Sequence, residues 1–359
     1  MTSNYDLITK DNIRRRGEEF DDIGHLISEQ LYSDRSHFVY ELLQNAEDAL
    51  ERRFQDNPQS KLPCSVKFLL FEDRLEFRHF GQNFTENDVR GISDVLRGTK
   101  NEEITQIGKF GIGFKSVYAF TAKPEIHSGD EHFAIERYIR PKAIEPWLNV
   151  VKGETVFIFP FNNKDLPKDK AFDLILDKLK KLGPRTLLFL SHIDEIAWSV
   201  DSTEENGQYL REIKNRNEAS QVTVIGHNNG QDEEETWLIF GRPVTVPNSE
   251  QSTRVEVGFR IEIDSKDKTE RISRINDAPL VVYFPTEIYT KFGFLVHGPY
   301  HTTPARDNIH KNDDWNKNLI EETANLVVEA LRNLKTMGLL SVSLLEALPI
   351  RVGDFPQER

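Results

Sequence analysis

A segment with two unlike faces, residues 36–54, constrains the fold of this chain more than any other feature. At about 100° per residue, four apolar residues fall on one arc of a helix: Val39, Leu43, Ala46 and Leu50. Three polar residues fall within about 60° of one another on the opposite arc: Glu41, Asn45 and Asp48. The pattern predicts a helix that packs on a sheet through its apolar arc and presents two carboxylates and an amide on the other.

Runs of aromatic and β-branched residues predict that sheet. Residues 65–71 and 74–80 flank Glu72-Asp73 as a hairpin, and residues 127–138 form a second hairpin that turns at 128–130. Residues 155–161 alternate as a further strand. A helix over 169–182 is expected to end at Gly183-Pro184. The first domain is therefore predicted to span residues 1–184.

The remainder of the chain predicts a second, mostly β unit. Strand-like runs are 186–190, 193–200, 222–225, 236–240, 255–263 and 280–284. Charged stretches at 231–235 and 264–270 are expected to be turns, and residues 313–334 have the apolar spacing of a final helix. The sequence thus predicts an α+β fold, with a second domain over 185–337 and a C-terminal tail over 338–359 that leads into a further region.

Composition excludes several classes of protein. The net charge of −13 argues against a broad duplex-binding surface, although a narrow basic groove stays open. Cys64 is the only cysteine, so an intrachain disulfide and a cysteine-based metal site are excluded. No apolar run approaches the ~18 residues that cross a bilayer. We therefore expect a protein of the cytoplasm that does not bind membranes.

A glycine-rich segment, residues 98–113, precedes the apolar-periodic run 114–120, for which we expect a helix. Gly108, Gly111 and Gly113 have the order G-x-x-G-x-G, which differs from the dinucleotide and P-loop fingerprints. Backbone N–H groups without neighbouring Cβ atoms can close on a phosphate at a helix N-terminus. Tight turns and close packing use the same residue, so this motif alone leaves both interpretations open.

Together, the helix and the glycine-rich segment resemble a known pattern. Residues 41–49, Glu-Leu-Leu-Gln-Asn-Ala-Glu-Asp-Ala, are similar to the E-x-x-x-N-A-x-D-A box of the GHKL ATPases, which include gyrase, MutL, histidine kinases and heat-shock chaperones. Residues 107–118 resemble the chaperones' I-G-x-F-G-x-G-F-x-S-x-Y, and residues 98–100 the start of their ATP lid. Phe84-Thr85, Asp88-Val89 and His127-Ser128-Gly129-Asp130 resemble the sacsin-like branch in particular.

The resemblance implies a Bergerat-type α/β sandwich that binds ATP and Mg²⁺, followed by a transducer-like middle domain. Glu41 would polarise the water that attacks the γ-phosphate, and Asn45 would hold Mg²⁺ to the phosphates. Asp48 and Arg52 would line the pocket. The resemblance further assigns phosphate and lid contacts to five residues: Lys100, Gly108, Gly111, Gly113 and the Phe114 backbone.

Two positions depart from the family pattern. His79-Phe80-Gly81 stands where the family has its adenine-reading D-x-G step, so a carboxylate is absent there. A neutral His79 could accept from the adenine amino group, or it could be an ordinary histidine at the edge of the core. Gly153-Glu154-Thr155-Val156 stands for the family's G-T-x-V, so that Thr155 serves only with a shift of one residue.

Arg306, in the polar loop 302–308, stands where chaperone-like members place an arginine that reaches the γ-phosphate. It would act as a nucleotide sensor, or it pairs with Asp307 and caps its loop. His297, His301 and His310 are near in sequence but poorly spaced for a metal site. The first functional hypothesis is a sacsin-like, chaperone-type ATPase driving lid and domain closure, within a bacterial defence or restriction-type protein. A client or larger assembly and an ATP-dependent dimer are open partners; a non-hydrolysing nucleotide switch and a MutL- or topoisomerase-like DNA clamp are the alternatives.

Overall fold

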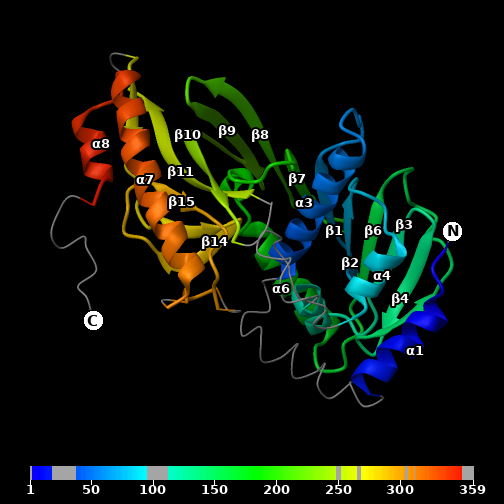
Figure 1. The fold of residues 1–359 in the computed structure, drawn as a ribbon. Coiled ribbons are helices and arrows are strands. Elements are labelled where there is room, and N and C mark those ends of the chain that lie inside the picture. The colour runs from blue at the N-terminus through cyan, green and yellow to red at the C-terminus, as the bar shows by residue number, and fades with distance from the viewer. Residues whose placement is uncertain are drawn as a thin grey trace. The chain divides into compact units, whose positions relative to one another are not determined.

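The computed structural model describes residues 2–17, 38–94, 112–247, 252–264, 268–303, 306–310 and 312–349. The fold is mixed α+β, with a large sheet and several helices, as the sequence predicts (Figure 1). The contacts divide the chain into two compact units. The first comprises residues 1–183, 190–209 and 226–231, and the second comprises 184–189, 210–225 and 232–359. The predicted functional boundary at residue 184 stays a prediction.

The sheet of the first unit has the strand order β7-β1-β2-β6-β3-β4-β5. Neighbouring strands are antiparallel except β1 and β7, which are parallel. The strand bounds are β1 (Ser65–Leu70), β2 (Arg74–His79), β3 (Glu125–Ser128), β4 (Glu131–Glu136), β5 (Arg140–Ala143), β6 (Thr155–Pro160) and β7 (Glu195–Val200). Both predicted hairpins are therefore confirmed, and so is the strand after Glu154.

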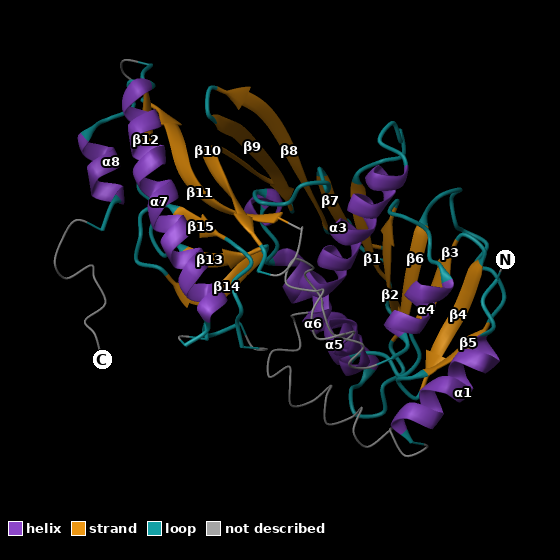
Figure 2. Ribbon diagram, viewed as in Figure 1, coloured by secondary structure: helices purple, strands orange, loops and turns teal. Residues whose placement is uncertain are grey.

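One face of this sheet is apolar. Helix α3 (Phe38–Asp56) lies over the sheet of the first unit (Figure 2). Alternate residues of β1 and β2 are fully buried, among them Phe68 and Phe77, whose rings lie 4.7 Å apart. The four residues of the predicted apolar arc of α3 are all buried to within 2%. Burying four such side chains contributes several kcal/mol, and it turns the opposite arc of the helix away from the sheet.

Further helices of the first unit were only partly predicted. They are α1 (Tyr5–Arg16), α4 (Glu86–Ile92), α5 (Ile112–Lys115) and α6 (Lys168–Lys180), and a 3₁₀ turn (Ser116–Ala119) follows α5. The helix expected over 114–120 is thus only one short turn of α-helix followed by 3₁₀ geometry. The apolar pattern of the sequence does not indicate α1 or α4.

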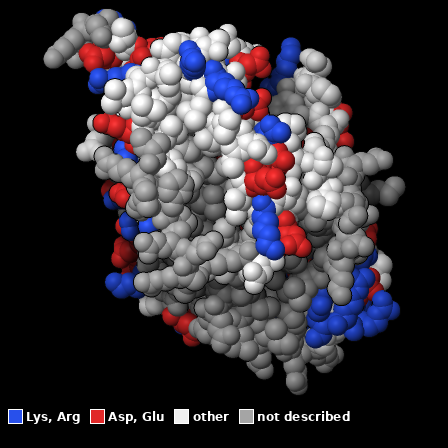
Figure 3. Space-filling model, turned by 60° about the vertical axis from the view of Figure 1, so that its left-hand side comes forward, with Lys and Arg blue, Asp and Glu red and all other residues white. Residues whose placement is uncertain are grey.

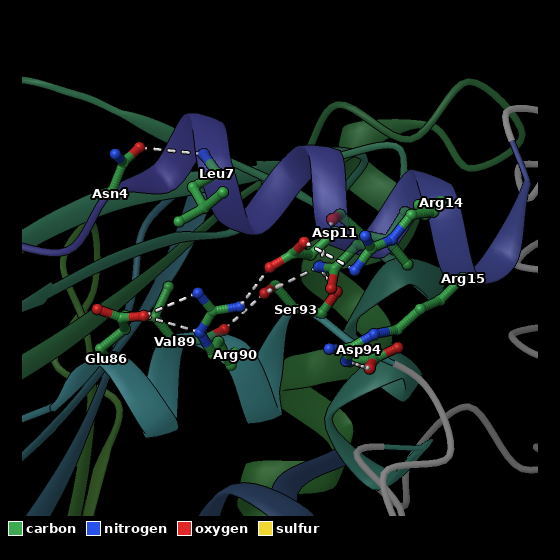
Figure 4. Close-up of polar contacts among 12 residues, drawn as sticks. Asn4, Leu7, Asp11, Arg14, Arg15, Glu86, Val89, Arg90, Ser93 and Asp94 are labelled. Atoms are coloured by element: carbon green, nitrogen blue, oxygen red, sulfur yellow. Dashed lines mark hydrogen bonds and ion pairs between the residues drawn. The ribbon is translucent and has the colours of Figure 1, made fainter.

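Ion pairs between helices hold α1 and α4 together (Figure 4). Arg90 on α4 contacts Asp11 of α1 at 3.1 Å and Glu86 of its own helix at 2.8 Å. Asp94, just beyond α4, pairs with Arg15 at 3.6 Å, and Asn4 caps α1 by accepting from the Leu7 N–H. These polar contacts add to a small buried face of α1, which consists of Tyr5, Ile8 and Asn12.

The second unit is mostly sheet, with the strand order β14-β13-β15-β11-β10-β9 and β12 paired to β11. Helix α7 packs on β11, and α8 packs beside β12. The strands β8, β9 and β10 have residues in both units. The bounds are β8 (Asn206–Arg216), β9 (Ala219–Asn228), β10 (Gln231–Thr245), β11 (Ser252–Ile263), β12 (Glu270–Ser273), β13 (Pro279–Val282), β14 (Phe284–Tyr289), β15 (Leu295–His297), α7 (Asp314–Thr336) and α8 (Val342–Ala347).

Two local predictions for this part of the chain are wrong. Residues 186–190 are not a strand: a 3₁₀ turn occupies Pro184–Leu187, because proline sets a turn φ at its start. Residues 231–235 are not a turn but the first residues of β10. The turn is Asn229-Gly230, with φ values of 48° and 81°, a dipeptide that favours two-residue hairpin loops.

Candidate nucleotide site

The outward arc of α3 carries a half-buried polar stripe. Its members recur at intervals of four, three and four residues: Glu41, Asn45, Asp48 and Arg52. The residues between them are largely buried, so the stripe is the accessible edge of an otherwise covered helix. The helical spacing predicted this arrangement for Glu41, Asn45 and Asp48, and Arg52 continues the same line one turn further along α3.

Gly113, on α5, lies directly against Glu41. A Cβ at this glycine would overlap the Glu41 carboxylate, so the absence of a side chain makes room for it. The Ser116 hydroxyl donates to the Gly113 carbonyl at 2.6 Å, and the Phe114 ring packs 6.0 Å from Phe157 of β6. The end of the glycine-rich segment and the polar stripe of α3 therefore meet at Glu41.

Asp48 occupies an environment that disfavours its charge. Burial, followed by the charges of Glu51, Glu47 and Glu41, raises the pKa of Asp48 to about 8, against a smaller opposing effect of Arg52. Arg52 is itself engaged, because its guanidinium pairs with Asp88 of α4 at 2.5 Å. Asp48 is thus protonated near neutral pH in the free protein.

His79 ends β2 on the helix-covered face of the sheet and is 1% exposed. Burial and the nearby cations of Arg52 and Arg53 lower the pKa of His79 to about 3. The neutral ring accepts the Gly81 N–H at Nδ1 over 3.0 Å, so its own proton is on Nε2. The tautomer offers a donor at Nε2, rather than the acceptor that the amino group of adenine would need.

Gly81 and Thr155 complete this end of the sheet. A Cβ at Gly81 would come within 2.5 Å of the Ala49 Cβ, so only glycine allows β2 to approach α3 here. Thr155 pairs with His79 across β2 and β6, and its hydroxyl lies 2.6 Å from that of Ser128. Glu154 instead pairs with Arg78 at 3.0 Å. Thr155 therefore shares the face of His79, and its role in the site stays a prediction.

Arg306 belongs to the second unit and is largely buried. Its guanidinium donates to the carbonyls of Val282 and Phe284, at 2.6 and 2.9 Å, across the junction of β13 and β14. Asp307 accepts from the Thr303 hydroxyl. The sensor role of Arg306 stays a prediction. Three other predicted site residues lie outside the described part of the chain: Lys100, Gly108 and Gly111.

Two buried charged residues near the site were missed by sequence reasoning. Glu47, on α3, accepts three backbone N–H groups, and Lys115, on α5, donates to the carbonyls of Ile92 and Tyr138 at 2.8 and 2.6 Å. A signal existed for Glu47, because its helical position falls among buried residues and a carboxylate there needs donors. For Lys115 the pattern carried no comparable signal.

Lys115 should make the stability of the protein depend on pH. Burial lowers its pKa to about 7, against the opposing charge of Asp94; the rings of Tyr118 and Tyr138 also lie at this site. Between pH 7 and 10.5 the unfolded chain binds a proton that the folded chain does not, so the unfolding free energy gains about 1.4 kcal/mol per pH unit. Denaturant titrations should show this gain from pH 7.5 to 9.5 in wild type and its loss in Lys115→Met. The exposed Lys142→Met is the control, and equal slopes for all three proteins would contradict the assignment.

The described residues contain no cluster of three or more His, Cys, Asp or Glu side chains suited to a metal ion, and among them no helix is long and apolar enough to cross a membrane. Magnesium in a nucleotide site takes most of its ligands from phosphates and water, so one amide oxygen such as that of Asn45 fits it. On the surface drawn in Figure 3, acidic and basic side chains of the described residues are interspersed.

A model of the sacsin domain matches residues 21–137, which include the α3 stripe and Gly113. Protein NO VEIN of Arabidopsis thaliana is 26% identical over 86% of this chain, and human sacsin 29% over 46%. The chaperone protein HtpG of Treponema pallidum is 31% identical over 28% of the chain. The chain spans only 12%, 5% and 19% of these relatives. The motifs, the stripe and these matches together establish a resemblance to the sacsin-like ATP-binding proteins of the GHKL superfamily.

Proposed function

We propose that the first unit binds ATP with Mg²⁺ and hydrolyses it at the polar stripe of α3. The observation that carries the proposal is the position of the Glu41 carboxylate against Gly113, where a glycine-rich segment meets a helix face that also bears Asn45 and Asp48. Phosphoryl transfer to water needs a base or orienting group, a metal and backbone donors in one place. The stripe offers a carboxylate at Glu41 and an amide that can bind the metal at Asn45, and Gly113 offers its backbone N–H.

In this proposal Glu41 takes up a proton from the attacking water or orients that water. Asn45 offers its amide oxygen to Mg²⁺, which would neutralise charge on the phosphate oxygens. The backbone at Gly113 and Phe114 would donate to the phosphates. The phosphate and lid contacts of Lys100, Gly108 and Gly111 stay a prediction from the resemblance, because these residues lie outside the described part of the chain. The end of the site that would receive the adenine base of ATP is lined by Asp48, Gly81 and Thr155. The proposal also includes a Bergerat-type sandwich for the first domain and a transducer-like second domain. In that second domain, Arg306 would sense the γ-phosphate of the nucleotide.

The experiment is steady-state release of phosphate from ATP, paired with titration of ATP binding. We expect turnover in Mg²⁺ and its loss, by more than tenfold, when EDTA removes the metal, with recovery on adding Mg²⁺ back. As a folding control, the circular dichroism of the protein should be the same before and after EDTA is added. Binding of neither ATP nor other nucleotides would refute the proposal.

A second candidate, a nucleotide-binding switch without hydrolysis, is favoured by one observation. His79 is buried and offers an N–H donor at Nε2. Its contact with adenine would therefore differ from the contact that a carboxylate makes with the adenine amino group. Binding of ATP without release of phosphate would support this candidate instead.

A further inference from the structure

The chain passes from the second unit to the first between Phe189 and Leu190. The last residue before this crossing is anchored in the second unit, where the Phe189 ring stacks on His297 at 4.9 Å with planes 9° apart. Four residues earlier, Arg185 forms two hydrogen bonds with Glu235, at 2.7 and 2.6 Å. The segment 184–189 is therefore held in place up to the crossing point.

Glu47 of α3 anchors the chain immediately after the crossing. One oxygen of its carboxylate accepts the N–H groups of Ser191 and His192 at 2.5 and 2.8 Å. The other oxygen accepts the N–H of Ile193 at 2.9 Å. The Glu47 side chain is 6% exposed, and bonds from N–H groups to a buried carboxylate are stronger than bonds to a neutral acceptor.

Further contacts join the same segment to α3 and to Cys64, which precedes β1. The ring of Phe54, two turns along the helix from Glu47, stacks on His192 at 5.6 Å. The Asp194 N–H donates to the Cys64 carbonyl at 2.9 Å, and the Arg53 guanidinium donates to the Cys64 sulfur at 3.3 Å. Residues 191–194 therefore move with α3 and the start of β1.

We propose that Glu47 is a positioning residue that couples the polar stripe of α3 to the second unit through the crossing at Phe189–Leu190. The inference rests on the proposed nucleotide site, because Asn45 and Asp48 flank Glu47 on the same helix. Two residues of chain span at most about 7 Å, so the connection between the anchors has little slack. A displacement of α3 caused by nucleotide is passed along the backbone to Phe189, and through His297 to β15.

The test compares Glu47→Gln with Glu51→Gln, an exposed glutamate of the same helix that serves as the matched control. Glutamine keeps the size of the side chain, but its NH₂ group faces a backbone N–H where an oxygen accepted before. In the full chain we expect at least tenfold faster hydrogen exchange of the Ser191–Ile193 amides. ATP affinity should stay within threefold of wild type, and kcat should fall at least tenfold.

Coupling has a readout that a purely structural role would not move. In wild type, a non-hydrolysable ATP analogue with Mg²⁺ should change the hydrogen exchange of β11 and β15. Glu47→Gln should bind the analogue and lose this change. Phe189→Leu, which leaves Glu47 and the stripe intact but removes the stacking on His297, should lose it too, and it replaces Glu47→Gln as the test if that variant does not fold.

The outcomes separate the two claims. A wild type that binds no nucleotide refutes the proposed function and the coupling with it. A wild type that binds and hydrolyses ATP, with both variants retaining its kcat and its exchange response in β11 and β15, refutes the coupling alone.

Discussion

Glu41→Gln is expected to lower the turnover of ATP by about 10²- to 10⁴-fold, the contribution typical of a positioned general base. Glutamine keeps the length and the half-buried position of the side chain but cannot accept a proton from water. The affinity for ATP should change by no more than threefold, because Asn45 and the backbone at Gly113 remain. Single-turnover phosphate release and equilibrium titration measure the two quantities separately.

Gly113→Ala provides an independent version of the same experiment. Its methyl group would overlap the Glu41 carboxylate. The carboxylate can therefore still accept a proton, but it is displaced from its position in the site. We expect at least a tenfold loss of turnover. Gly91→Ala on α4 is the matched control, since no described atom lies within 4 Å of a Cβ at that position.

Turnover of Glu41→Gln above a third of wild type would contradict the base assignment.

Asp48→Asn is expected to have opposite effects on stability and on binding. The folded protein holds a proton on Asp48 up to about pH 8, whereas the unfolded chain releases it near pH 4. Stability of the wild type is therefore lost as the pH rises through this window. The neutral amide avoids that loss, so at pH 8 the variant should have a larger unfolding free energy, by about 2 kcal/mol after allowance for solvent at this half-buried side chain.

Denaturant titrations at pH 4.5, 6 and 8 check this prediction, with the exposed Asp173→Asn on α6 as control. The advantage of Asp48→Asn should grow with pH, while its affinity for ATP should fall because a polar contact of the site is lost. Such a trade between stability and binding is expected where a site holds a carboxyl group in an unfavourable environment. An advantage that does not change with pH would contradict the raised pKa.

Most of the first unit could be predicted from local sequence pattern. The arc of α3 that contains Leu43 and Ala46 is fully buried, and the stripe that contains Glu41 lies opposite, because the helical period alone determines both. The hairpin of β1 and β2 followed from alternation and a charged turn. The register at Thr155 was left open by the motif and depended on pairing with His79 and Ser128, which is a contact between distant segments.

Elements held by distant polar contacts could not be predicted in this way. Helix α1 has a weakly apolar sequence, and its attachment depends on partners such as Asp94 that are far away in the chain. The start of β10 was mistaken for a turn because its residues 232–235 are acidic, whereas Asn229-Gly230 was the stronger local signal. The roles of Lys115 and Glu47 could not be predicted for the same reason. Both side chains bind backbone groups of distant segments, which the periodicity of the sequence does not reveal.

Cys64, the single cysteine of this chain, contacts both α3 and the segment 191–194. Its sulfur accepts from Arg53 of α3, and its carbonyl accepts from Asp194 in the segment that Glu47 anchors. The thiol is therefore a native reporter that needs no engineered label site. We expect its rate of reaction with a thiol-specific reagent to rise when α3 loosens from that segment, and this rate can be measured while nucleotide is added.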